Sequence, residues 1–312
     1  MQYRHTPVML RETIEHLNCS KGKVIADCTL GGAGHARAIA ERILPEGLLI
    51  GIDRDRDALK NAESVLFSFG SRVILVNDNF ANLPAVLSGL GIDLIDGALL
   101  DLGLSYYHID GSGRGFSFMR NEPLDMRMDT SQDLTAADIV NRESEEKLAE
   151  IFRQYGEERY AAKIARRLVA ARSCGPVETS RQLASIVHEA YPAKQRHKGK
   201  TDPATRVFMA LRIAVNGELE NLRIFLESVV SCLAKGARLC IISFHSLEDR
   251  MVKQKMRFWE KKCVCPPDLP VCACNKQQEF KIITKKALVA SPEEVKANPM
   301  ARSAKLRVAE KL

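Results

Sequence analysis

The chain has 312 residues, of which 46% are hydrophobic and 27% charged, and its net charge at pH 7 is +7. This length suits one large domain with a smaller second domain, and the apolar content is ample for a buried core. No apolar run approaches the ~20 residues that span a bilayer. The N-terminal segment MQYRHTPVML also lacks the apolar core of a secretory signal. We therefore expect a cytoplasmic protein with no membrane partner.

Positive charge is concentrated in two stretches. Residues 151–203 carry 11 Lys/Arg against 5 Asp/Glu, and residues 251–312 carry 14 against 6. The rest of the chain is acidic, with 21 basic and 28 acidic residues. Two basic surfaces beside an acidic core fit a polyanionic partner. Helix surfaces are also often rich in Lys and Arg for solubility, so charge alone leaves both interpretations open.

The segment VIADCTLGGAGH at residues 24–35 predicts a strand, a tight turn and the start of a helix. Its three glycines lie within four residues, and they allow backbone amides to lie directly against a ligand. The spacing is not G-x-G-x-x-G, and Ala33 and His35 crowd the place of a dinucleotide pyrophosphate. The turn therefore favours S-adenosylmethionine over a dinucleotide, with an ordinary strand-to-helix turn as the alternative.

Polar side chains follow three further apolar runs. The run 48–52 ends at Asp53, whose carboxylate can accept both hydroxyls of a ribose. The run 72–76 leads into NDNF, where Phe80 could stack on adenine or belong to the core, and the run 97–100 ends at Asp101. Because the carboxyl ends of parallel strands meet at one sheet edge, these residues predict a nucleoside site in an α/β fold.

The pattern then changes to that of a helical insertion over residues 110–206. Residues 111–129 have no clear period and predict a packed loop over the active site, with Phe116 and Phe118 as candidates for gripping a base. Helical spacing follows, together with a second helix over 180–191. Four basic residues are expected on the exposed helical face: Arg159, Lys163, Arg166 and Arg167. The α/β core is expected to comprise residues 1–109 and 207–312.

The α/β pattern resumes with helices over 204–233, a fifth strand over 238–243 and a closing β-hairpin at the sheet edge. The fifth strand ends in SFHSLEDR, a segment that contains Ser, His, Glu and Asp. Members of a hydrolytic triad meet in space from separate elements, so we expect structural hydrogen bonds here. His35 and His245 have no spaced metal partners, and both are expected to be polar loop residues.

Four cysteines form two C-x-C pairs: Cys263, Cys265, Cys272 and Cys274. This cluster resembles a four-thiolate zinc site, but C-x₂-C is the commoner spacing and three prolines could support the loop without a metal. Whether these thiols bind zinc stays open, and we predict no metal in the active site. The other five cysteines are scattered and suit a reducing compartment.

Taken together, ten motifs in order resemble the bacterial 16S ribosomal RNA (cytosine-N4)-methyltransferases of the MraW family. The motifs are HTPVML at His5, TLGGAGH at Thr29, GIDRD at Gly51, DLGLS at Asp101, RGFSF at Arg114, PLDMRMD at Pro123, YGEER at Tyr155, ATRVFMALRIAVN at Ala204, SFHSLEDR at Ser243 and ARSAKLRVAE at Ala301. Several residues differ from those usual at these positions in the family: Ala33, Ser105 to His108, Asp202, Met209 and Met300.

The resemblance implies a Rossmann-like class I methyltransferase sheet with a helical insertion domain for RNA recognition. It implies S-adenosylmethionine as cofactor, 16S rRNA or the small ribosomal subunit as partner, and no DNA. The methyl acceptor would be the exocyclic N4 amine of a cytidine in the decoding region. The family's cofactor contacts map here onto Ala33, Gly34, His35, Asp53, Phe80, Asp101 and His108.

For catalysis we select Asp101 and Ser105, because an acceptor that orients the amine protons would assist the attack of N4 on the sulfonium methyl. Two alternatives come from other function classes. A nicotinamide oxidoreductase would need the pyrophosphate fingerprint that this glycine turn lacks. A non-catalytic ribosome-assembly protein would bind RNA equally well but would transfer no methyl group.

Overall fold

The computed structural model describes residues 7–192, 202–266 and 273–312. His5, the basic loop 193–201 and Cys272 lie outside the described residues. The described residues form two compact units, one comprising Leu104–Glu218 and the other residues 7–103 together with Leu219–Leu312. Among the described residues, no helix combines the length and the apolar character that crossing a bilayer requires.

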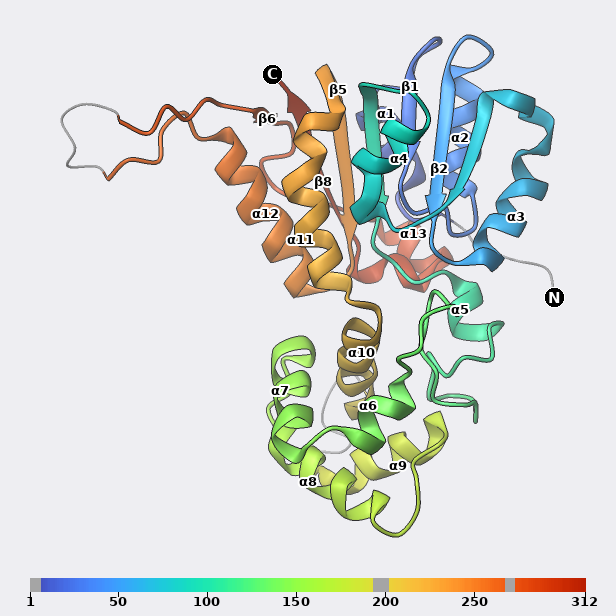
Figure 1. Cartoon of the computed structure of the whole chain (residues 1–312), viewed down its shortest axis with the longest axis vertical. Coiled ribbons are helices and arrows are strands. Elements are labelled where there is room, and N and C mark those ends of the chain that lie inside the picture. The colour runs from blue at the N-terminus through green and yellow to red at the C-terminus, as the bar shows by residue number, and fades with distance from the viewer. Residues whose placement is uncertain (1–6, 193–201, 267–272) are drawn as a thin grey trace. The chain divides into compact units, whose positions relative to one another are not determined.

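The larger unit is built on one mixed sheet with strand order β3-β2-β1-β4-β5-β8-β6, in which β7 also pairs with β8 (Figure 1). Its strands are β1 (Val24–Asp27), β2 (Leu48–Asp53), β3 (Val73–Asn77), β4 (Ile95–Asp101), β5 (Leu233–Ser243), β6 (Phe280–Ile282), β7 (Leu288–Val289) and β8 (Lys305–Lys311). The first five strands are parallel, and β8 runs antiparallel to β5 and to β6. The predicted parallel sheet and the closing antiparallel strands are therefore confirmed.

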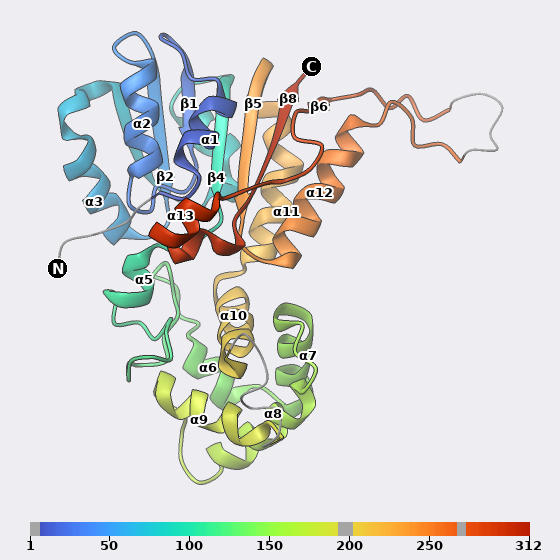
Figure 2. The same ribbon diagram turned by 180° about the vertical axis from the view of Figure 1, so that it is seen from behind.

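Helices cover both faces of this sheet. One face carries α1 (Leu10–Leu17), α2 (Gly34–Ile43), α3 (Arg56–Leu66) and α13 (Pro292–Ala297), as Figure 2 shows. The other face carries α4 (Leu83–Gly89), α11 (Glu218–Ser228) and α12 (Ser246–Glu260). Each face has its own cluster of buried apolar side chains, because the central strands are apolar on both sides.

The sheet order reverses between β1 and β4, which lie side by side and lead to connections on opposite sides. In open α/β sheets, ligands bind in the crevice outside the carboxyl ends of the strands at such a point. The ends of β1, β2 and β4 are Asp27, Asp53 and Asp101. The fold thus places three carboxyl groups at the edge where a ligand is expected.

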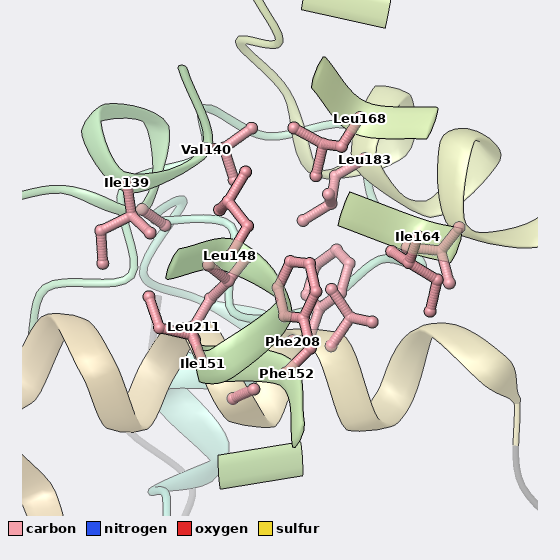
Figure 3. Close-up of a cluster of buried hydrophobic side chains, with 14 of the residues drawn as sticks. Ile139, Val140, Leu148, Ile151, Phe152, Ile164, Leu168, Leu183, Phe208 and Leu211 are labelled. Atoms are coloured by element: carbon pink, nitrogen blue, oxygen red, sulfur yellow. The ribbon is translucent and has the colours of Figure 1, made fainter. Parts of the chain in front are cut away.

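The smaller unit is helical. Its helices are α5 (Tyr106–Asp110), α6 (Ala136–Arg142), α7 (Glu145–Gly156), α8 (Ala161–Arg172), α9 (Ser180–Ala190) and α10 (Pro203–Asn216). Side-chain N-caps fix where five of these helices begin: Ser105, Thr135, Ser144, Thr179 and Asp202. Figure 3 shows the apolar side chains at the centre of this unit, gathered around Phe152.

The helical unit extends beyond the predicted insertion 110–206 at both ends. The C-terminal extension follows from the packing of α10, whose apolar side chains Val207, Phe208 and Leu211 belong to the core of the helical unit. The predicted boundary cut this helix near its first turn. A boundary there would expose these side chains, so α10 folds as part of the helical unit.

Residues 111–129 form a packed loop of the helical unit. The guanidinium of Arg114 donates hydrogen bonds to the carbonyls of Arg127 (3.2 Å) and Met128 (3.1 Å). Phe116 is buried in the helical core, and Phe118 packs edge-on against Phe208 with ring centroids 5.3 Å apart. The prediction that Phe116 grips a base is therefore wrong for this conformation, since its ring stabilises the core.

Candidate active site

Asp53 holds the glycine turn that follows β1. Its Oδ2 accepts a hydrogen bond from the backbone amide of Gly31 (2.9 Å), and its Oδ1 accepts one from the amide of Asp55 (2.9 Å). An acidic residue at the end of the second strand is the type of acceptor that binds ribose hydroxyls in nucleotide-binding sheets. The carboxylate that was predicted to bind a nucleoside therefore also fixes the backbone of the predicted pocket.

Ala33 and Gly34 form the junction between this turn and α2. Ala33 is buried and adopts the left-handed conformation, with φ 59°, which an L-residue adopts only with some strain. A Cβ on Gly34 would lie 2.8 Å from the Pro7 side chain. The glycine at position 34 is thus required by the packing of Pro7 against the helix start, in addition to its predicted approach to a cofactor.

Asp101 lies at the end of β4 and is surrounded by groups from three other segments. Its backbone amide donates a hydrogen bond to Oγ1 of Thr29 (2.7 Å), and its Oδ1 accepts one from the amide of Gly103 (3.3 Å). Its Oδ2 lies 3.7 Å from Nδ1 of His35. Asp101 is therefore anchored by its backbone and by one carboxylate oxygen, with the imidazole facing the other oxygen.

His35 is the second residue of α2 and is buried, so the expectation of a polar loop residue was wrong. Its Nε2 lies 3.0 Å from the carbonyl oxygen of Val8. Because a carbonyl can only accept, Nε2 carries a proton in this contact, and Nδ1 is directed at Asp101.

Burial disfavours the ionised form of two carboxyl groups at this edge, Asp27 and Asp101. Desolvation raises the pKa of Asp101 to about 7, opposed by the Gly103 amide and reinforced by the negative charge of Glu248. Desolvation also raises the pKa of Asp27 well above its ordinary value, and the charges of Asp101 and Asp53 add to that effect. Asp101 therefore exchanges its proton near neutral pH.

Phe80 lies in the short 3-10 helix Phe80–Asn82 after β3. Its ring meets the buried ring of Phe225 edge-on, with centroids 5.7 Å apart, and it packs against the apolar core while staying half-buried. The preceding segment is tied to β2, because the amide of Asp78 donates to the carbonyl of Asp53 (3.2 Å). The core interpretation of Phe80 is thus confirmed, and stacking on adenine stays a prediction.

Ser105 and His108 belong to the helical unit. Ser105 caps α5 by accepting a hydrogen bond from the amide of His108 (3.2 Å), and its Oγ lies 3.0 Å from Nδ1 of the same residue. Both side chains are buried, and the His108 ring lies 5.0 Å from that of Phe116. The structure thus gives this pair a capping contact, and their predicted catalytic and cofactor roles stay predictions.

The segment SFHSLEDR forms structural hydrogen bonds, as expected. His245 is the N-cap of α12, and its Nδ1 accepts a hydrogen bond from the amide of Glu248 (3.4 Å). The Glu248 carboxylate in turn accepts from the amides of Phe244 (2.9 Å) and His245 (3.3 Å). This reciprocal capping box fixes the start of α12 and places a buried negative charge that acts on Asp101.

Sequence reasoning missed Thr29 and Glu248 as supporting residues of the site. Thr29 joins the ends of two strands, since its hydroxyl accepts from Asp101 while its amide donates to Asp27 (3.2 Å). A hydroxyl residue between a strand end and a glycine turn was the available signal for Thr29. The H-x-x-E spacing of a capping box was the signal for Glu248.

Comparison with known proteins agrees with this geometry. The model of the MraW methylase family matches residues 2–312. The chain belongs to this family. It is 64% identical over 312 residues to "Ribosomal RNA small subunit methyltransferase H" of Desulfosudis oleivorans, covering 100% of both chains. Proteins of the same name from Desulforapulum autotrophicum (52% over 309 residues, 99% of each chain) and Symbiobacterium thermophilum (49% over 312 residues, 100% and 98%) are also similar. The resemblance predicted from the motifs is confirmed.

Proposed function

We propose that this protein transfers the methyl group of S-adenosylmethionine to the exocyclic N4 amine of a cytidine in 16S ribosomal RNA. The observation that carries the proposal is the end-to-end match to the MraW methylase family, with relatives named for methylation of small-subunit ribosomal RNA. The site supports it through Asp101, an anchored acceptor at the carboxyl edge where the sheet order reverses.

The residues at this edge fit the proposed cofactor. Asp53 is an acidic acceptor of the type that binds ribose hydroxyls and also holds the Gly31 amide (2.9 Å), and the half-buried Phe80 supplies an aromatic ring of the type that stacks on adenine. When bound, S-adenosylmethionine supplies an electrophilic methyl group on a positively charged sulfur. A non-catalytic assembly role is not favoured, because the described chain retains the carboxylates and the glycine turn that such a role does not need.

Asp101 acts on the cytosine amine in this proposal. The N4 lone pair is delocalised into the ring, so the nitrogen must be pyramidalised and aligned before it attacks. Fixing both reactants can supply about 7 to 11 kcal/mol, and a positioned proton acceptor about 10² to 10⁴ in rate. The ionised Asp101 carboxylate accepts a hydrogen bond from the amine and then the proton that N4 loses as it becomes positive. Nδ1 of His35 lies 3.7 Å from Oδ2 of this carboxylate.

The direct test is a tritiated-methyl transfer assay that compares free 16S rRNA with small ribosomal subunits. We expect label on a cytidine that mass mapping locates in the decoding region. Absence of label on both substrates, with the cofactor bound, would favour the assembly role. The same assay determines whether naked RNA or the assembled subunit is the substrate.

Asp53→Ala is expected to weaken S-adenosylmethionine binding by about 1 to 3 kcal/mol, because ribose hydroxyls lose a charged acceptor and Gly31 loses its anchor. Titration calorimetry measures the change. Asp96→Ala is the matched control, since Asp96 accepts the Val24 amide (2.8 Å) at the opposite end of β1. Equal affinity in folded Asp53→Ala and wild type would remove Asp53 from the cofactor site.

The helical unit is proposed to bind RNA through basic residues at α8. Lys163, Arg166 and Arg167 lie on its exposed face, but α8 begins at Ala161, so Arg159 precedes the helix and lies over the Tyr160 ring (4.8 Å). The prediction that all four share one helical face was therefore wrong. Two of them form surface ion pairs, Arg166 with Glu145 (3.4 Å) and Arg167 with Glu189 (2.6 Å).

Neutralising these four residues to Gln is expected to weaken RNA binding and to flatten its salt dependence, while cofactor affinity stays constant. Each lost phosphate contact reduces the log-log salt slope by about 0.7 for single strands. Exposed ion pairs are weak, so phosphates can displace the two carboxylates. A matched control neutralises four exposed residues of the larger unit: Arg37, Arg42, Lys60 and Arg72. Equal slopes in both quadruple variants would contradict the prediction.

A further inference from the structure

A cysteine-bearing loop joins the end of α12 to the start of β6, and the catalytic proposal does not use it. Figure 1 shows the loop as an outgoing and a returning arm beyond α12. In the sequence, Cys263 and Cys265 follow the end of α12, and Cys274 precedes β6. Although separated along the chain, the three sulfur atoms all lie within 4.8 Å of one another. The Sγ atoms of Cys263 and Cys274 are 3.7 Å apart.

We propose that Cys263, Cys265 and Cys274 form a thiolate site for one zinc ion. Zinc binds cysteine sulfur at about 2.3 Å in tetrahedral geometry, which places two sulfur ligands about 3.8 Å apart. The distance between Cys263 and Cys274 agrees with this spacing, and the third sulfur lies within the same cluster. Three thiolates leave one coordination position for a further ligand.

Backbone amides near the three cysteines point at the sulfur atoms and favour a negative charge on them. The amide of Val264 donates to Sγ of Cys274, that of Cys265 to Sγ of Cys263, and that of Ala273 to Sγ of Cys265, each at 3.4 Å. Each sulfur thus receives one amide hydrogen bond, and two of these bonds cross between the arms. Donors that point at a sulfur stabilise its thiolate form, which is the form that binds a metal.

The base of the loop is already ordered by ordinary packing. Trp259 and Phe280 stack with centroids 4.6 Å apart, and the amide of Glu279 donates to the carbonyl of Trp259 (2.9 Å). Residues 261–279 contain no helix or strand in their described parts, and a loop of this kind needs internal support to stay compact. A zinc ion bridging the two arms would supply that support beyond the stacked base.

This site is structural because it lies far from the proposed chemistry. The helix α12 has 15 residues, so its two ends are about 22 Å apart. Glu248, which acts on Asp101, lies at the start of α12, whereas the cysteine loop follows its end. The proposal therefore stands independently of the methyltransferase assignment.

Elemental analysis of the full chain, purified under reducing conditions from zinc-supplemented cells, tests the proposal. We expect about one zinc per chain in the wild type, since a tetrahedral thiolate site holds one ion. Cys263→Ser and Cys274→Ser are expected to lose it, whereas Cys174→Ser, which changes an exposed cysteine of the helical unit, is expected to keep it. Zinc-free wild type, or zinc retained in both loop variants, would overturn the proposal.

Limited trypsin digestion gives a second measurement that does not depend on the variants folding well. Lys262 and Lys276 flank the cysteines, so the loop carries its own cleavage sites. Added Zn²⁺ is expected to protect these bonds in chelator-treated wild type by at least about tenfold in rate, because it orders both arms. Equal cleavage with and without Zn²⁺ would contradict a metal clamp. A mass two hydrogens lower in zinc-free protein would identify a disulfide instead.

Discussion

Asp101→Asn is expected to lower the single-turnover rate of methyl transfer on small subunits by about 10² or more, with S-adenosylmethionine affinity changed less than tenfold. Asn keeps the size of the side chain and one acceptor oxygen for the Gly103 amide. It removes the charge that favours N4 becoming positive and the base that takes its proton. Rapid-quench kinetics and calorimetry measure the two effects separately.

The pH dependence gives this prediction a second readout. Because burial raises the pKa of Asp101 to about 7, its carboxylate is lost as the pH falls through that value. The wild-type rate should therefore decrease below about pH 7, tenfold for each unit, and level off above it. In Asp101→Asn this limb should be absent, since no group at position 101 titrates.

Asp27→Asn provides the matched control. Asp27 is the neighbouring buried carboxyl group, and burial raises its pKa well above the ordinary value. An amide at this position keeps the side-chain size and the oxygen that accepts from the Thr29 amide (3.2 Å). The methyl-transfer rate of Asp27→Asn should therefore stay far closer to that of the wild type than the rate of Asp101→Asn does. If Asp101→Asn lowers rate and cofactor affinity by the same factor, or leaves the rate unchanged, Asp101 does not act on the amine. The search would then pass to the backbone at Ser105.

The carboxyl edge was predictable because each strand is a short apolar run that ends in a polar residue. Parallel strands bring such ends together whatever the details of side-chain packing. Asp53 and Asp101 were identified in this way, and the order of the strands is consistent with the prediction. Each strand and its terminal acidic residue could be predicted from a few neighbouring residues, without knowledge of contacts between distant segments.

What the sequence did not reveal depends on contacts between distant segments. The direction of His35 toward Asp101 requires the α2 start, the Val8 carbonyl and the end of β4 to meet. The burial of Phe116 likewise depends on the packing of the helical core, because an irregular loop has no period that separates inner from outer residues. The insertion boundary was misplaced for a similar reason, since only packing shows which unit α10 joins.

Phe152→Ala is expected to reduce the free energy of unfolding of the helical unit by about 3 to 5 kcal/mol. Phe152 is fully buried in α7 at the centre of the apolar cluster in Figure 3, where it belongs to the same core as Ile164 and Phe208. Truncation to Ala removes the ring and leaves a cavity in this core. Because side-chain caps fix the start of α7, the surrounding helices are expected to fill the cavity only in part.

Denaturant unfolding followed by circular dichroism measures this loss, which should appear in the transition of the helical unit. Phe67→Ala is the control, because that ring is 86% exposed and its removal should change stability by less than about 0.5 kcal/mol. S-adenosylmethionine affinity should persist in Phe152→Ala under native conditions, since Asp53 and Phe80 belong to the larger unit. A loss below about 1 kcal/mol would mean that the helices repack around position 152, and that α7 is not fixed by its aromatic core.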